Sequence, residues 1–322
     1  MNVKPLRVDA PLQDYEEQAA GLATADAHGD LARWYRFESW EALSRYAEAA
    51  KPPGSPVFRF ESAVEAVIDG RVDDLAAWIR EDPELPTARS TRMHRATLLH
   101  YVAANGVEQY RQKSPPNAVE VARLLLQHGA PVDALAHMYG ERDTTLLLLV
   151  SSTPPSEAGV QIPLIEALLD SGAAIEGALM TALAFGHREA AEALARRGAR
   201  TDNLAAAAGL GRVAEAERLL ATADSAERHR ALALAAQHGQ PEIVRLLLDA
   251  GEDPNRYNPA GNYAHSTPLH QAAVAGHERV VRLLVERGAR LDITDTVYHG
   301  TPLGWAEYAG QNAVRDYLKA HS

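Results

Sequence analysis

The chain has 322 residues, no cysteine and a formal net charge of −11, because 43 Asp and Glu residues outnumber 32 Lys and Arg residues. The absence of cysteine excludes disulfides, thiol nucleophiles and cysteine-based zinc sites, and the negative charge argues against nucleic acid as a partner. Hydrophobic residues make up 46% of the chain but aromatic residues only 6%, a balance typical of helices that pack through Ala and Leu.

The first part of the chain is predicted to be helical and separate from the remainder. Residues 13–27 are acidic and Ala-rich with apolar positions at helical spacing, and residues 39–49 read as a second helix with Ser39 as its N-cap. Residues 51–56, Lys-Pro-Pro-Gly-Ser-Pro, form the clearest linker. We therefore expect an N-terminal helical cap and linker over residues 1–58 and a second domain over residues 59–322. A partner-binding module is the alternative for the first part.

No membrane or export segment is expected. The N-terminus leads into acidic residues rather than an apolar run, and the longest apolar run, residues 146–150, is too short to span a bilayer. These features predict a cytoplasmic protein without membrane contact.

Residues 266–289 read as two short helices joined by a turn. Thr267 and Pro268 suit the start of the first helix, Gly276 suits the break between the helices, and Gly288 ends the second. A helix pair of this size cannot bury both of its faces, so it needs copies stacked beside it. Seven further copies follow the same pattern, with the turn position occupied by Gly70, Gly106, Thr153, Gly186, Gly211, Gly239 and Gly310.

This pattern resembles the ankyrin repeat, over roughly residues 60–320. The resemblance implies an all-α fold, an ankyrin-type α-solenoid of about eight helix-turn-helix repeats with β-hairpin fingers. It does not imply a particular partner. In such stacks the opening histidine hydrogen-bonds neighbouring backbone, which assigns His100 and His270 a structural role.

The repeats differ in their connections. Residues 107–117 and 154–159 are insertions between helices, which we expect to be tolerated surface loops rather than a functional flap. The fingers at 129–144, 251–267 and 288–301 are long, whereas those at 172–177 and 198–202 almost vanish. The missing fingers would leave the first helices of the middle repeats uncovered, as the apolar floor of a central cleft. The alternatives are a cleft filled by the N-terminal segment and simple erosion of the fingers.

The sequence offers little for catalysis. A Gly-Leu-Gly segment at residues 209–211 imitates a dinucleotide fingerprint, but it follows a helix rather than a strand. Asp292 and Asp295 could form an acid–base pair with His299, although a solvated loop edge is the favoured interpretation. We expect no catalytic residues, no metal site and no cofactor.

The favoured function is a non-catalytic protein–protein interaction scaffold that binds a protein partner on its concave face and long fingers. Aromatic side chains would be the anchors, since they supply apolar area with one polar end. The alternatives are a small-molecule-binding protein or enzyme that uses the central cleft, and an immunity or inhibitor protein. The expected partner-binding residues are Tyr139, Arg142, Asp143, Phe185, His238, Tyr257, Tyr263, His265, Tyr298, His299 and Tyr308.

Overall fold

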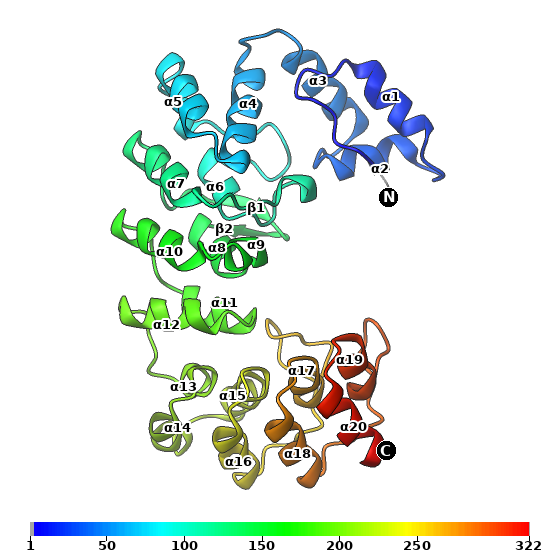
Figure 1. The fold of residues 1–322 in the computed structure, drawn as a ribbon, viewed down its shortest axis with the longest axis vertical. Coiled ribbons are helices and arrows are strands. Elements are labelled where there is room, and N and C mark those ends of the chain that lie inside the picture. Colours follow the sequence, from blue (N-terminus) through cyan, green and yellow to red (C-terminus); the bar gives the residue numbers. More distant parts are fainter. Residues whose placement is uncertain (1–2, 322) are drawn as a thin grey trace. The chain divides into compact units, whose positions relative to one another are not determined.

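The computed structural model describes residues 3–321, apart from the side chain of Glu141. By internal contacts the chain divides into two compact units, Met1–Ile175 (unit 1) and Glu176–Ser322 (unit 2). Both units are built mainly from short helices (Figure 1).

Unit 1 begins with three helices and continues with three helix pairs. The first three are α1 (Leu12–Ala20), α2 (Ala27–Trp34) and α3 (Trp40–Ala50). The pairs are α4 (Pro56–Asp69) with α5 (Val72–Glu81), α6 (Leu98–Val102) with α7 (Ala118–Gln127), and α8 (Thr145–Val150) with α10 (Gln161–Asp170). Between them lie two 3-10 turns, η1 (Leu85–Thr87) and η2 (Gln109–Arg111), the short helix α9 (Thr153–Glu157), and strands β1 (Ala136–Met138) and β2 (Glu141–Asp143).

Unit 2 contains five helix pairs in its described residues. They are α11 (Ala178–Ala184) with α12 (Arg188–Arg196), α13 (Leu204–Leu210) with α14 (Val213–Leu220), α15 (Ser225–Gln237) with α16 (Pro241–Asp249), α17 (Pro268–Val274) with α18 (Glu278–Glu286), and α19 (Pro302–Tyr308) with α20 (Asn312–His321). The first helices pack in sequence order, α11 on α13, α13 on α15, and onward to α19 (Figure 1). The expected all-α architecture of stacked helix pairs is confirmed within each unit, with three pairs in unit 1 and five in the described residues of unit 2.

The opening Thr-Pro-Leu-His segment starts α17 as its residue types predict. Thr267 and His270 form a capping box, in which the backbone N–H of Thr267 donates to Nδ1 of His270 at 3.2 Å. Nε2 of His270 lies 3.1 Å from the carbonyl oxygen of Gly300, in the next connection. His100 repeats this arrangement, with its Nε2 3.0 Å from the carbonyl oxygen of Ala134. The predicted structural role of both histidines is confirmed.

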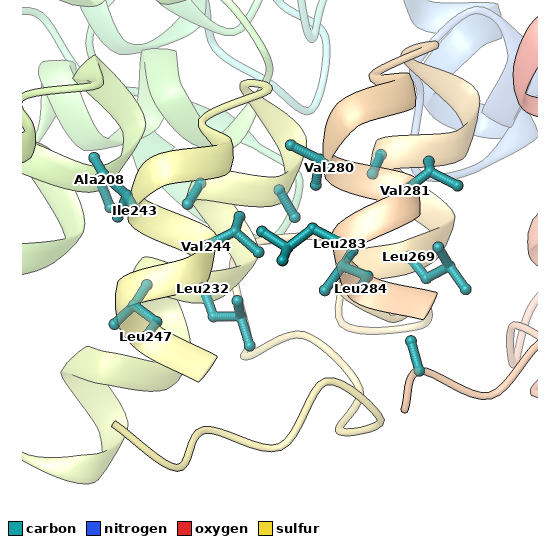
Figure 2. Packing of buried hydrophobic residues seen from close by; sticks show 14 of the residues in the cluster. Ala208, Leu232, Ile243, Val244, Leu247, Leu269, Val280, Val281, Leu283 and Leu284 are labelled. Atoms are coloured by element: carbon teal, nitrogen blue, oxygen red, sulfur yellow. The ribbon is translucent and has the colours of Figure 1, made fainter. Parts of the chain in front are cut away.

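The core of unit 2 is a continuous apolar layer between successive helix pairs. Val244 on α16 points toward Leu283 on α18, whereas Ile243 on the other side of α16 lies beside Ala208 of α13 (Figure 2). Burying a Leu, Ile or Val side chain contributes about 1.5–3 kcal/mol, so each pair depends on its neighbours for most of its stability.

Two first helices of the middle repeats, α13 and α15, are covered, contrary to the expectation of an exposed apolar floor. Every residue of α13 is buried, and so are residues 231–236 of α15. Alanine is the reason, because its small side chain lets α13 and α15 approach until they cover one another. α15 also reaches back to α11, where Nε2 of Gln237 donates to the carbonyl oxygen of Ala184 at 3.0 Å. The central cleft with an apolar floor is therefore wrong for these helices.

The N-terminal helices α1–α3 have a core of their own, which includes Leu31 and Leu43. This segment packs against the first repeats through α3 on α4 and through Trp34, whose ring stacks on Tyr110 at 5.0 Å between centroids. Within unit 1 it therefore covers the start of the stack, as terminal repeats require. Whether residues 1–58 are a separate domain stays a prediction.

A buried charge cluster, formed by Glu61, Arg92, Glu108 and Arg111, lies beneath this contact. All four side chains are at most 3% exposed. Arg92 pairs with both carboxylates and donates to the carbonyl oxygen of Tyr35 at 2.6 Å, while Arg111 donates to Glu61 at 2.7 Å. Burial by itself raises the pKa of Glu108, but Arg92 and Arg111 outweigh it and hold the pKa well below its usual range.

The insertion at residues 107–117 is thus part of the core and not a tolerated surface loop. Glu108 and Arg111, which it supplies, are needed to neutralise Arg92 and Glu61, because an unpaired buried charge costs several kcal/mol. The second insertion is different: it forms α9, buries Pro155, and leaves residues 156–159 exposed.

Candidate partner-binding surface

Most of the large apolar side chains that the structure exposes are anchors predicted from the sequence. Met93 and Val297 are exposed in addition to the predicted set. The most exposed side chains are those of Tyr298, at 76%, and Tyr308, at 92%. The predicted residues in this exposed group are Tyr139, Phe185, Tyr257, Tyr263, Tyr298 and Tyr308.

In unit 1 the predicted residues Tyr139, Arg142 and Asp143 lie on the β1–β2 hairpin. β1 pairs antiparallel with β2, with His137 opposite Arg142. Tyr139 and Gly140 form a two-residue turn with φ of 51° and 85°, the left-handed pair that a hairpin of this length requires. The hydroxyl of Tyr139 donates to Oδ1 of Asn105 at 2.5 Å, so the exposed ring has a fixed position.

In unit 2 the two long connections, residues 252–266 and 290–300, are joined to each other. The backbone N–H of Thr296 donates to the carbonyl oxygen of His265 at 2.9 Å. The hydroxyl of Tyr257 donates to the carbonyl oxygen of Thr294 at 2.7 Å. These connections contain no assigned strand among the described residues, so the predicted β-hairpin form holds only for the finger at 129–144. Pro254 and Pro259 help to explain this, because proline cannot donate to a strand ladder.

Asp295 organises the second of these connections. It is fully buried and accepts hydrogen bonds from the backbone N–H groups of Val297, Tyr298 and Gly300 at 2.6–2.9 Å. Nε1 of Trp305 donates to it at 3.0 Å. Burial raises the pKa of Asp295, but these hydrogen bonds prevail and hold it well below its usual range. Asp295 therefore orders this loop. Because its carboxylate oxygens accept hydrogen bonds from the loop and from Trp305, it is not placed to act as an acid or base with Asp292 and His299.

Around Asp295 the aromatic side chains gather. The ring of His265 lies 6.2 Å from that of Tyr263, 5.9 Å from that of Tyr298 and 5.7 Å from that of Trp305, between centroids. We name these four residues and Tyr257 the aromatic loop surface. Four of its five members were predicted from the sequence.

Trp305 was missed. A signal was present, because the eighth repeat has Gly304 and Trp305 where the seventh has His270 and Gln271. The structure shows that the indole contacts the ring of His270, 5.2 Å away between centroids. The departure from the repeat motif therefore marks a residue that supports the loops.

Three of the predicted residues have left-handed backbone conformations that favour glycine. They are Tyr139, Tyr263 and His299, with φ of 51°, 54° and 56°. Such conformations are uncommon for bulky side chains and persist where the surrounding structure fixes them. The presence of large side chains at these positions, where glycine or asparagine would be less strained, favours a role for the side chains themselves.

The remaining predicted residues are dispersed. Phe185 is half-exposed at the end of α11, and Tyr308 is exposed at the end of α19. His238 is buried and its Nε2 lies 2.8 Å from the carbonyl oxygen of Leu183. Burial lowers the pKa of His238. Its imidazole joins α15 to α11 and has little surface for a partner, so we leave it out of the proposed contacts. Leu210, the last residue of α13, is buried as well.

One hollow lies near the predicted floor of the middle repeats. It has a volume of about 420 Å³ and lies at the starts of α13 and α15, with Asn203, Asp224, Glu227 and Arg230 in its lining. Among the described residues, no three His, Asp or Glu side chains gather as a metal site requires. In the same part of the chain no helix has both the length and the apolar character to cross a bilayer.

Comparison with known protein families identifies the family to which these repeats belong. The family described as ankyrin repeats (3 copies) matches residues 65–258 and 232–321. The chain belongs to the ankyrin-repeat family. Ankyrin repeats are generally protein–protein interaction modules, and this ankyrin-repeat protein shares their repeated helix pairs.

Individual relatives match only part of this ankyrin-repeat chain. Ankyrin repeat and SAM domain-containing protein 6 of Mus musculus is 38% identical over 95 residues, which cover 30% of this chain and 10% of that protein. Protein PhlB of Serratia liquefaciens is 39% identical over 72 residues, 22% of this chain and 30% of that protein. Cyclin-dependent kinase 4 inhibitor B of Rattus norvegicus is 33% identical over 118 residues, 28% of this chain and 90% of that protein. The crystal structure of the human ASB11 ankyrin repeat domain is 21% identical, with a TM-score of 0.40 over 81% of this chain and 97% of that one.

Proposed function

We propose that this ankyrin-repeat protein is a non-catalytic scaffold that binds a protein partner through the aromatic loop surface of its last two repeats. The observation that carries the proposal is the combination of exposed aromatic rings with a buried Asp295 that fixes the loop beneath them. Tyr and Trp are enriched at protein interfaces, where a few such side chains supply most of the binding free energy.

Order in the loops supports a role in binding. An interface pays about 0.5–1.5 kcal/mol for each flexible side chain that it immobilises. The hydrogen bond from Tyr257 to Thr294 and the ring contacts of His265 restrict these side chains before any partner arrives. These side chains therefore lose little conformational entropy when a partner binds, so more of the contact free energy appears as affinity.

Other predicted residues are further candidate contacts, each within its own unit. Tyr139, Arg142 and Asp143 on the hairpin of unit 1 offer one aromatic ring with charged neighbours. His299 follows Tyr298 of the aromatic loop surface in the chain. Phe185 and Tyr308 add exposed rings elsewhere in unit 2. A cytoplasmic location remains part of this proposal.

An inhibitor is a second candidate of the same kind. One relative is named cyclin-dependent kinase 4 inhibitor B, and the match covers 90% of it. An inhibitor would use the same surface to cover a target protein, and the net charge of −11 would steer it toward a basic target.

The test begins with identification of proteins that co-purify with the tagged chain from its native host. Wild type is compared with Tyr263→Ala/Tyr298→Ala, with Met93→Ala as the control, because Met93 is exposed but lies outside the proposed contacts. Binding of the purified partner is then measured by calorimetry. We expect each tyrosine replacement to cost about 2 kcal/mol of binding free energy, and Met93→Ala to have no effect.

A partner that binds the double variant as tightly as wild type would refute the assignment of the surface. If the partner is an enzyme, its activity is measured with increasing amounts of the chain. Loss of that activity in proportion to binding would identify an inhibitor, whereas unchanged activity would favour the scaffold.

A further inference from the structure

A groove of about 780 Å³ lies in unit 1, away from the aromatic loop surface in sequence. Its floor is one face of α4, including Phe58 and Ile68, and one wall is α5, including Ala77 and Trp78. Residues 5–9 form the opposite wall, and Tyr110 and Lys113 of the insertion close one end. All of these residues belong to unit 1.

The repeat pattern explains why this groove exists. Within a unit, a second helix can have a second helix on either side: α7 packs between α5 and α10 in unit 1, and α16 packs between α14 and α18 in unit 2. α5 is first in its row, as Figure 1 shows, and has such a neighbour on one side only. The N-terminal helices cover α4 through α3, but among the described residues none of them packs to a comparable extent on α5. The groove therefore occupies the place where the second helix of a preceding repeat would lie.

The side chains of α5 that line the groove follow helical spacing. They are Arg71, Asp74, Ala77, Trp78 and Glu81, which form one ridge of the helix surface. Leu75 and Ile79, on another face of α5, are buried. A ridge of this kind is complementary to the groove of another helix. Trp78 also contacts Phe58, 6.2 Å away between ring centroids, so the apolar centre of the groove is supported from both α4 and α5.

The opposite wall is fixed as well. The backbone N–H of Leu6 donates to the hydroxyl of Tyr35 at 3.1 Å, and Nε2 of Gln18 donates to the carbonyl oxygen of Lys4 at 2.5 Å. The groove is thus held open by contacts within unit 1.

Charge at the rim indicates which helix would fit. Five carboxylates and three cations line the groove. Ion pairs with Arg7, Arg71, Lys113 and the buried Arg111 engage Asp9, Glu65, Asp69 and Asp74, so Glu81 is the carboxylate that a partner would meet most directly. The whole chain carries −11, which adds to the attraction for a basic partner. We propose that the groove binds an amphipathic helix of a partner protein, with an apolar stripe that meets Trp78 and Ala77 and with Lys or Arg beside the stripe. Helix-in-groove docking of this kind depends on apolar anchors at helical spacing, and the flanking charges set the register.

The probe is a short blocked peptide with Leu at helical spacing flanked by Lys, measured against the full chain by fluorescence anisotropy. A second peptide carries Glu in place of Lys. Two charge reversals on α5 form a matched pair, because Glu81 lines the groove whereas Asp73 is exposed outside it. We expect saturable one-to-one binding of the Lys peptide, about tenfold weaker binding to Glu81→Lys, and less than about twofold change for Asp73→Lys.

Ala77→Arg tests the apolar centre, because a long charged side chain would occupy the groove. It should abolish binding while leaving the thermal unfolding temperature within the error of wild type. Hydrogen exchange of the complex should show protection in α4 and α5. Tyr263→Ala/Tyr298→Ala should bind the peptide as wild type does, which separates this groove from the aromatic loop surface.

Equal weakening by Asp73→Lys and Glu81→Lys would show general charge attraction and overturn the proposal, as would equal binding of the Glu peptide or an absence of protection in α4 and α5. A dimer of the free protein that Ala77→Arg dissociates would show that a second copy occupies the groove, and would also overturn it.

Discussion

Trp305 and Asp295 are joined by a hydrogen bond of 3.0 Å from the indole Nε1 to the buried carboxylate. This bond connects helix α19 to the loop that carries Tyr298, whose backbone N–H donates to the same carboxylate. The backbone that carries the exposed Tyr298 is therefore held by the buried Asp295 and the half-buried Trp305, and changes to either should alter binding without touching a partner.

Asp295→Ala is predicted to lower both stability and partner affinity. It removes the acceptor of four hydrogen bonds, and each buried donor left unsatisfied costs about 1–3 kcal/mol, so a loss of at least 2 kcal/mol in unfolding free energy is expected. Asp292→Ala is the control, since Asp292 is exposed and pairs only locally with Arg290. It should change stability by less than about 0.5 kcal/mol. Urea denaturation measures the unfolding free energy of both variants. Equal losses of unfolding free energy would contradict the role of Asp295.

Arg92→Ala is predicted to be among the most damaging single changes in unit 1. It leaves Glu61 and Glu108 buried with less compensation, and breaking a buried pair costs about 3–5 kcal/mol. Arg282→Ala removes an exposed pair with Glu278 and should cost less than about 1 kcal/mol. The measurement is chemical denaturation followed by tryptophan fluorescence, because Trp34 reports on the N-terminal helices. A small effect of Arg92→Ala would show that water reaches the cluster.

Two glycines inside helices should respond in opposite ways to replacement by alanine. Alanine is favoured over glycine in a helix by about 1 kcal/mol. A Cβ at Gly304 would have only Thr301 Oγ1 nearby, at 3.7 Å, so Gly304→Ala should stabilise the protein. A Cβ at Gly209 would lie 2.7 Å from a methyl group of the buried Leu183, and overpacking costs about 1–3 kcal/mol. Gly209→Ala should therefore destabilise, and a rise in its melting temperature would contradict the close packing of α11 and α13.

Stability is predicted to fall as the pH falls from neutral, in two stages. Burial lowers the pKa of His100 from 6.5 to about 4, so between these values the unfolded chain binds a proton that the folded chain excludes. Protonation of this group costs the folded state nothing at neutral pH, and the cost rises to about 3 kcal/mol as the pH drops from about 6.5 to about 4. Burial lowers the pKa of His270 as well and acts in the same direction.

The second stage comes from carboxylates. Asp295 and Glu108 have pKa values held below the usual range, so their contribution is present above the unfolded value and is lost as acid protonates them. Unfolding free energy measured at a series of pH values tests both stages. His100→Gln should flatten the dependence between pH 6.5 and 4 while leaving the acid stage, and an unchanged slope would contradict the assignment.

The sequence was sufficient for features that depend on neighbouring residues. Thr267, Pro268 and Gly276 determine where helices begin and end through local hydrogen bonds and backbone conformation, so the repeats could be located without coordinates. Tyr139 and Tyr298 were predicted as exposed anchors because aromatic residues on long connections have no core to enter.

Features that depend on contacts between distant segments were not predicted. Arg92 and Glu108 lie in irregular, polar segments that resemble solvated loops, and only the fold brings them together with Glu61. The burial of α13 by α15 was missed for a related reason. The loss of the fingers is visible in the sequence, but the close approach that alanine allows depends on both helices together.

The attachment of the N-terminal helices has a consequence for synthesis on the ribosome. The carbonyl of Tyr35 receives its hydrogen bond from Arg92, 57 positions later, and Glu61 receives one from Arg111, 50 positions later. The N-terminal helices are translated before the second repeat, so Trp34 and Tyr35 lack the ring of Tyr110 until that repeat has left the exit tunnel. Until then the nascent chain exposes these two aromatic side chains to other contacts.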